Sequence, residues 1–278
     1  MLMRTAELLP RDARLWQIVC LSSLAAFGSL SGAFGLSLFS VGATLVGALG
    51  AQVVGSRLAG IPLEIRSALI TTLSLTILVR ADAAWLMGLA GVLAIGSKFV
   101  IRAGGKHVFN PANFALVVLS LGLDGVWTSP GQWGTSVLFA AIFAGLGAAT
   151  TARASRLDTP LVFLAAYAAL VLGRAAWLGD PWAIPINSLQ NGALIVFAFF
   201  MISDPKTTPD DRLARWVFVS GVALLGFLIQ FNLHIPDGIF YALFLASLIR
   251  PVIEFARPAR HFEWPTLSLP AAPERSAP

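Results

Sequence analysis

Long apolar runs dominate this chain and restrict the folds open to it. A helix that crosses a bilayer needs about 20 largely apolar residues, and ten such runs lie between charged or Pro- and Gly-rich breaks. Hydrophobic residues make up 57% of the chain and charged residues only 12%, which excludes a soluble domain of this length. The sequence predicts an all-α polytopic membrane protein with about ten transmembrane helices, near residues 15–34, 36–55, 64–79, 83–101, 110–123, 134–152, 159–178, 187–203, 213–231 and 236–255.

The basic residues predict the orientation of these helices, because cytoplasmic loops collect Lys and Arg. If the N-terminus lies inside, 17 of the 19 Lys and Arg residues fall on the cytoplasmic side, and the other 2, Arg80 and Arg174, fall outside. We therefore expect a bacterial-type cytoplasmic (inner) membrane protein with both termini in the cytoplasm. The bilayer explains the net charge of +5, and we expect no nucleic-acid partner because no basic stripe with interleaved aromatics occurs.

The ends of the chain differ from the apolar region between them. Residues 1–14 are expected to form a cytoplasmic segment, since no small-residue cleavage site follows the first apolar run. Residues 15–256 would form the membrane domain. Residues 257–278 contain five prolines and no apolar face, so they are expected to be a disordered cytoplasmic tail.

A weak internal repeat relates the two halves of the membrane domain, about 15–123 and 134–256. Residues 88–100 and 109–121 can be laid beside 219–231 and 235–248. The shared positions are mostly small and apolar, so chance similarity is an open alternative. If the repeat is real, the odd number of helices in each half makes the repeats inverted, an arrangement that brings interrupted helices together at a ligand site.

The loop at 104–112, which reads G-G-K-H-V-F-N-P-A, has the composition of a binding site. Asn110 is a favourable N-cap and Pro111 suits the first helical position. The N–H groups of this helix start would face two glycines and Lys106, which favours an anionic or carbonyl-rich ligand such as a phosphate or the pyrimidine end of a flavin. The alternative is that Lys98, Arg102 and Lys106 only anchor a helix end at the membrane surface.

A second loop, at 199–209, reads F-F-M-I-S-D-P-K-T-T-P. Its carboxylate, Asp204, directly follows an apolar run, where an acid is costly unless it is paired or hydrated. We therefore expect Asp204 to be functional. The alternative is a helix-end carboxylate paired with Lys206 or Arg212, followed by an ordinary N-cap at Asp210 or Asp211.

The sequence offers few residues for a metal site or a disulfide bond. Cys20 is the only cysteine, and the three histidines are far apart without metal-ligand spacing. No metal site is predicted.

The two loops resemble the Gly-rich F-N-P-A and F-F-M-A-T-D-P elements of a membrane protein family, RnfD of the Rnf complex and NqrB of the Na⁺-translocating NADH:quinone oxidoreductase. Both occur in the family's order and spacing. The resemblance implies two inverted five-helix repeats, similar to urea-transporter-like channels, and electron transport through flavins. The cofactor-binding set that we predict with it is Lys98, Arg102, Gly104, Gly105, Lys106, Phe109, Asn110, Pro111, Asp204, Pro205, Lys206 and Thr207.

The chain departs from this family at the S-G-A-T motif, whose Thr takes FMN through a phosphoester bond. The corresponding loop, 123–136, lacks S-G-A-T. Gly42-Ala43-Thr44 has part of its letters but lies within an apolar run. Thr128 and Thr135 remain the alternative acceptors, and a noncovalent flavin, FMN or riboflavin, is expected instead.

The function that the resemblance implies is that of a membrane component in a flavin-based electron transport system, which relays electrons across the membrane. It would work beside other redox subunits or flavoproteins and not as a stand-alone enzyme. Two alternatives remain open: a small-solute or ion transporter or channel on the same scaffold, since fold does not fix function, and a cofactor-free structural component of a redox complex.

Overall fold

The computed structural model describes residues 12–30, 35–129 and 137–263. Helices occupy each of the ten segments predicted from the apolar runs, and the eighth segment is broken into three pieces. The helices are α2 (Ala13–Leu30), α3 (Leu38–Ala59), α4 (Ile65–Leu78), α5 (Ala84–Val100), α6 (Pro111–Gly122), α7 (Val137–Arg153), α8 (Asp158–Leu178), α9 (Ala183–Leu189), α10 (Gly192–Val196), the π-helix η1 (Phe197–Met201), α11 (Arg212–Asn232) and α12 (Gly238–Ala256).

Five of these helices, α2, α3, α8, α11 and α12, are long and apolar enough to cross a membrane. The bent pair formed by α9 and α10–η1, with an angle of 44° between its parts, brings the number to six if it is one span. Helices α4, α5 and α6 are apolar but only 14, 17 and 12 residues long. The chain is thus a polytopic helical membrane protein, and crossing by all ten segments stays a prediction.

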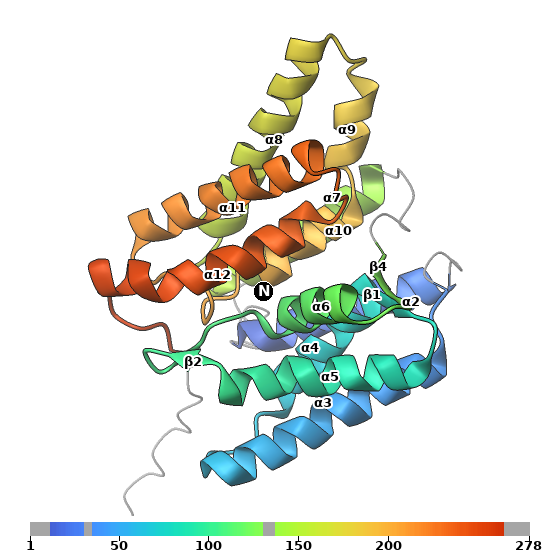
Figure 1. Ribbon diagram of the computed structural model, residues 1–278, viewed down its shortest axis with the longest axis vertical. Helices are drawn as coiled ribbons and strands as arrows, with labels where there is room; N and C mark the ends of the chain where they lie inside the picture. The colour runs from blue at the N-terminus through green and yellow to red at the C-terminus, as the bar shows by residue number, and fades with distance from the viewer. Residues whose placement is uncertain (1–11, 31–34, 130–136, 264–278) are drawn as a thin grey trace, which may run out of the picture.

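The helices form two groups (Figure 1), α2 to α6 in blue to green and α7 to α12 in yellow-green to red. Similar neighbour relations occur in both groups: α3 packs on α5 as α8 packs on α11, and α5 packs on α6 as α11 packs on α12. Helix α2 likewise contacts α4, while α7 contacts α10 and η1. The division into two repeat halves stays a prediction.

Four short strands were not predicted. Strand β1 (Val79–Ala81) pairs antiparallel with β4 (Val126–Thr128), joining the segments that follow α4 and α6. Strands β2 (Arg102–Ala103) and β3 (Lys106–His107) form a hairpin. Its turn is Gly104-Gly105, with φ values of 57° and 79°, a conformation that glycine adopts without steric cost.

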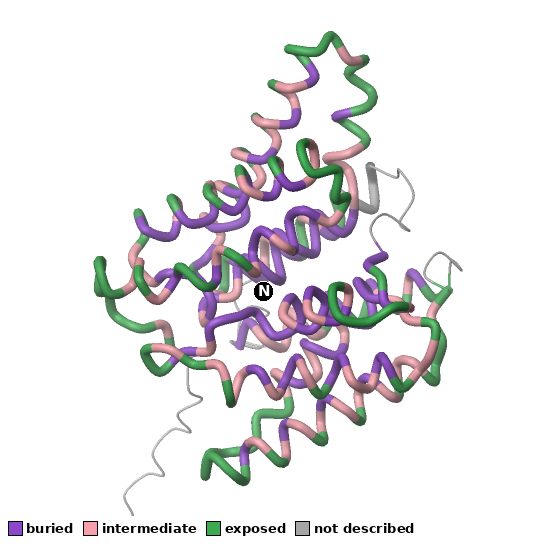
Figure 2. Tube along the Cα trace, in the orientation of Figure 1, coloured by how far each residue is buried: buried purple, intermediate pink, exposed green. Residues whose placement is uncertain are grey.

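Burial is concentrated on the inner helices (Figure 2), and all of α10 and η1 is buried. The outer helices expose large apolar side chains, such as Phe39, 83% exposed, and Phe255, 91% exposed. Exposed apolar surface on this scale suits lipid as the surrounding solvent.

Candidate functional site

A cavity of about 730 Å³ lies between the two helix groups. Its lining comes from the start of α2, the start of α4, the end of α5, the β2–β3 hairpin, the start of α6, the end of α7, η1 and the loop after η1. Every one of these segments belongs to a stretch that the charge asymmetry predicts on the cytoplasmic side. At another part of the molecule, strands β1 and β4 bring together two stretches that the same pattern predicts outside.

Asn110 joins the two predicted loops. Its Oδ1 accepts from the backbone N–H of Asn113 at 3.2 Å, and Pro111 takes the first helical position, so the predicted cap of α6 is confirmed. The side-chain amide Nδ2 lies 3.4 Å from both the Met201 carbonyl and Asp204 Oδ2. One side chain therefore starts a helix in the first half and contacts the end of η1 in the second.

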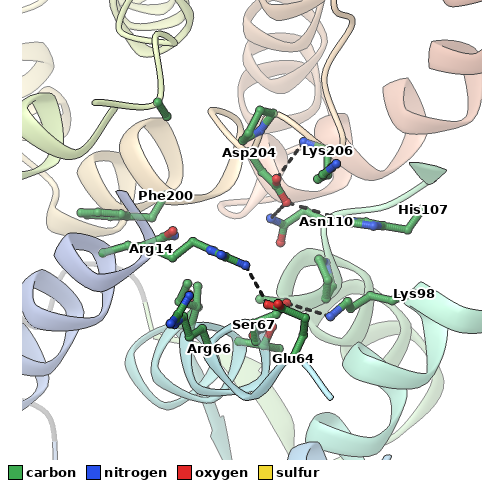
Figure 3. A pocket seen from close by; sticks show the side chains of 18 of the residues that line it. Arg14, Glu64, Arg66, Ser67, Lys98, His107, Asn110, Phe200, Asp204 and Lys206 are labelled. Carbon is green, nitrogen blue, oxygen red and sulfur yellow. Dashed lines mark hydrogen bonds and ion pairs between the residues drawn. The ribbon is translucent and has the colours of Figure 1, made fainter. Parts of the chain in front are cut away.

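Asp204 is held in the cavity wall by groups from both halves (Figure 3). Its Oδ1 accepts from the Lys206 backbone N–H at 3.0 Å, and Oδ2 lies 3.9 Å from His107 Nε2. Burial by itself would raise the pKa of Asp204, but His107, the Lys206 N–H and the charge of Lys106 outweigh burial and lower it.

The helix that ends shortly before Asp204, η1, is a π-helix. This conformation is rare and is found often at functional sites. The alternative partners predicted for Asp204 are engaged elsewhere. Lys206 Nζ donates to the Phe262 carbonyl at 2.8 Å, and Arg212 Nε lies 3.9 Å from Asp158. The predicted N-cap of the next helix is Asp211, whose Oδ1 accepts from the Ala214 N–H at 2.8 Å.

The facing wall is polar as well (Figure 3). Lys98 Nζ donates to Ser67 Oγ at 2.7 Å and to Gln52 Oε1 at 3.2 Å. Arg14 pairs with Glu64 at 2.7 Å and with Asp12 at 2.8 Å, and Arg66 also reaches Asp12. Phe199 and Phe200 supply apolar surface to the lining. The cavity therefore combines charged groups, neutral hydrogen-bonding groups and flat apolar walls.

Lys106 lines the cavity, but its ammonium group contacts carboxylates of the second half. Nζ lies 2.7 Å from Glu254 and 3.0 Å from Asp210, and it donates to the Thr208 carbonyl at 3.1 Å. The side chain is only 6% exposed. Arg156 pairs with Asp210 and Arg250 with Glu254, so the expected source of positive potential is also part of a buried ionic network.

Most of the predicted cofactor-binding residues meet at this cavity. Those in its lining are Lys98, Arg102, Gly105, Lys106, Asn110, Pro111, Asp204, Pro205 and Lys206. Gly104, Phe109 and Thr207 are described by the structure but are not in the lining. Phe109 stacks on Phe244 with ring centroids 4.6 Å apart, and the Thr207 hydroxyl donates to the Asp204 carbonyl at 3.2 Å.

Sequence reasoning missed several residues of the lining. His107 carries no signal as an isolated histidine, although it follows Lys106 within the first loop. Asp12, Arg14 and Ser67 were missed because nothing in a single sequence relates the chain start to a loop far along it. Part of the expected tail, residues 257–263, is described. The carbonyl of Phe262 accepts from Lys206 of the second loop, and His261 Nδ1 lies 3.2 Å from Asp210, which follows that loop. Residues 264–278 lie outside the described residues.

The alternative acceptors of a covalent flavin lie away from the cavity or outside the described residues. Thr128, in β4, is buried, and its hydroxyl donates to the Asp237 carboxylate at the start of α12. Thr135 falls in the stretch that the structure does not describe.

Comparison with known proteins gives consistent relatives. A model of the NQR2, RnfD, RnfE family matches residues 123–263, which include the second loop but not the first. The chain is 33% identical over 103 residues to the D subunit of the ion-translocating oxidoreductase complex of Citrobacter koseri, and 34% identical over 102 residues to that of Cronobacter sakazakii. These stretches cover 37% and 36% of this chain and 29% of each relative, so the match spans less than a third of the relatives' length.

Proposed function

This chain belongs to the NQR2, RnfD, RnfE family, and we propose that it is the membrane component of an ion-translocating redox complex that holds a flavin noncovalently in the cavity between its halves. The flavin, FMN or riboflavin, would relay electrons between other redox subunits or flavoproteins. The relatives are named as the D subunit of an ion-translocating oxidoreductase complex, which supports the role in a complex.

The observation that carries the proposal is the contact of Asn110 with Asp204 in the wall of one cavity. Two loops about ninety residues apart bring polar groups together beside the aromatic rings of Phe199 and Phe200. The volume of about 730 Å³ lies within the range of small-molecule and cofactor sites. A flavin has a flat apolar ring system with a polar pyrimidine edge, so this mixture of surfaces fits it.

Particular residues would hold the cofactor. The Asp204 carboxylate can accept from a ring or ribityl donor, Lys98 and the Asn110 amide can donate, and the aromatic side chains can contact the ring face. Bound flavin would supply one- and two-electron transfer, while the protein sets its position and electrostatic surroundings. The engagement of the Thr128 hydroxyl by Asp237 supports noncovalent binding.

The proposal includes ten membrane crossings, arranged as two inverted repeats with both termini in the cytoplasm of a bacterial-type inner membrane. The matching neighbour relations in the two helix groups support the repeats. The gathering of predicted inside segments around one cavity supports the orientation, because one crossing more or fewer between them would place them on opposite sides of the membrane.

The test is cofactor identification after purification of the full chain in mild detergent. We expect absorbance in the flavin bands, or uptake of riboflavin or FMN when they are supplied, and loss of uptake in Asp204→Ala. Asp211→Ala, at the cap of α11, is the matched control and should bind as the wild type does. A folded protein that takes up no flavin contradicts the proposal, and solute or ion flux in liposomes would then favour the transporter alternative.

A further inference from the structure

His107 brings an imidazole into the cavity beside the carboxylate of Asp204. Its Nε2 lies 3.9 Å from Asp204 Oδ2, and the two side chains are 16% and 21% exposed. Both line the same cavity, but they come from different halves of the chain.

The backbone around His107 is fixed on two sides. It pairs with Arg102 in the β2–β3 hairpin, and its carbonyl accepts from Arg250 Nη2 of α12 at 3.2 Å. The carboxylate of Asp204 is positioned by hydrogen bonds from the Lys206 backbone N–H and the Asn110 side-chain amide. The backbone of His107 and the carboxylate of Asp204 are therefore held near each other by contacts independent of any ligand.

Among the carboxylates near the cavity that the structure describes, Asp204 is the one that lies close to His107. Cations line the cavity from several elements: Arg14 in α2, Arg66 in α4, Lys98 in α5, Arg102 and Lys106 in the hairpin, and Lys206 in the loop after η1. The other carboxylates nearby are bound by cations, Asp12 and Glu64 by Arg14, and Asp210 and Glu254 by Lys106.

We propose that His107 and Asp204 form the proton-binding pair of this cavity, in which His107 Nε2 takes up a proton from solvent when electrons make the cavity more negative. The inference rests on the proposed function. The electron comes from a reduced one-electron carrier, or from dithionite in the test tube, and would be accepted by the flavin that the cavity would hold. The proton comes from solvent, so an Nε2–H bond forms as a solvent O–H bond breaks. The neutral imidazole becomes imidazolium, so the added negative charge is balanced and no covalent bond in the chain is broken.

Histidine is suited to this role because its charge changes between about pH 5 and 8, and partial exposure lets the imidazole exchange protons with solvent. His107 would be a positioning and charge-compensating residue, distinct from the residues that contact the ligand.

The experiment uses the full chain loaded with riboflavin and reduced stepwise with dithionite at several values between about pH 5 and 8. Proton uptake is measured with an indicator dye, and the midpoint potential is followed against pH. We expect His107→Gln to take up fewer protons on reduction, by up to about one per flavin.

The matched control is His261→Gln, because His261 pairs with Asp210 and is 61% exposed outside the cavity lining. This variant should keep the wild-type proton uptake. If His107→Gln does not fold, ¹⁵N-histidine NMR of the wild type answers the question, since the chain has only three histidines and His234→Gln and His261→Gln leave the third signal assigned. That signal should change to imidazolium on reduction.

The outcomes separate the two proposals. Flavin that binds normally, with unchanged proton uptake in His107→Gln or an unchanged His107 signal on reduction, overturns the proton role and leaves the proposed function intact. Failure of the folded wild type to bind any flavin removes both.

Discussion

At the scale of one residue, the contacts of Lys106 differ from those that its sequence motif predicts. From spacing alone, a lysine after two glycines predicts a positive charge directed at a ligand. Its ammonium group instead lies between Asp210 and Glu254, so the β2–β3 hairpin is fastened to the second half by a buried ionic contact.

Lys106→Ala should therefore cost stability before it affects redox chemistry. Removing one partner from a buried ionic cluster leaves uncompensated charge and costs about 3–5 kcal/mol. We expect a clear fall in the thermal unfolding temperature in detergent. Lys206→Ala is the control, since its Nζ makes one hydrogen bond to a backbone carbonyl, and it should change stability little. An unfolding temperature equal to wild type in Lys106→Ala would mean that the ionic contacts contribute nothing.

Thr128 gives a second prediction at this scale. Its hydroxyl is buried and engaged with Asp237, so a flavin transferase should not reach it. Denatured protein should show no in-gel flavin fluorescence, even after coexpression with an active flavin transferase. Fluorescence that disappears in Thr128→Ala or Thr135→Ala would establish the covalent alternative.

At the scale of elements, glycines set the close approach of α3 and α5. A Cβ atom on Gly91 would lie 2.4 Å from the Thr44 carbonyl oxygen and 2.7 Å from the Ala48 nitrogen, both backbone atoms of α3. On the other helix, a Cβ on Gly47 would lie 2.1 Å from the Gly88 carbonyl oxygen. Small residues at such crossings let two membrane helices pack by van der Waals contact.

Gly91→Ala should push these helices apart and cost about 1–3 kcal/mol, as overpacking does elsewhere. Gly96→Ala, on the same helix, meets no atom within 4 Å and should be neutral or slightly stabilising, since alanine favours helix over glycine. Thermal unfolding of the two variants in the same detergent makes the comparison. Equal unfolding temperatures would contradict the close packing.

The elements also separate what could be predicted from the sequence and what could not. The apolar runs predicted the positions of the helices, because long runs between charged breaks carry a strong local signal. The pairing of Val79–Ala81 with Val126–Thr128 depends on a long-range meeting of three-residue segments and has no such signal. The break before α10 and the π-helix η1 were missed for a related reason. Both lie in buried chain, and the spacing of residues along the sequence does not reveal them.

Some residues of the candidate site could also be predicted from the sequence, and others could not. Asn110 and Asp204 were found because each disrupts an apolar pattern with a polar group. Lys98 and Pro111 came with them. Asp12, Ser67 and His107 were not found, because their role depends on which helix ends meet around the cavity.

At the scale of the whole molecule, the orientation in the membrane can be tested directly. Reporters fused after residue 14 and within the 204–212 loop should report the cytoplasm, and one within the 124–133 loop should report the outside. The reason is the distribution of 19 Lys and Arg residues, of which 17 fall on the predicted inner side. An external 204–212 loop would rule out ten crossings with an internal N-terminus.

Several polar contacts join the two helix groups, and two of them lie at separate places in the fold. Thr128 contacts Asp237 at one, and Lys106 contacts Asp210 and Glu254 at the other. Alternating access in transporters of inverted-repeat design proceeds largely by rocking one bundle against the other, and such rocking would have to break both attachments. Attachments of this kind would keep a near-constant spacing across the cavity, which the proposed electron relay needs and a hinge-driven transport cycle does not.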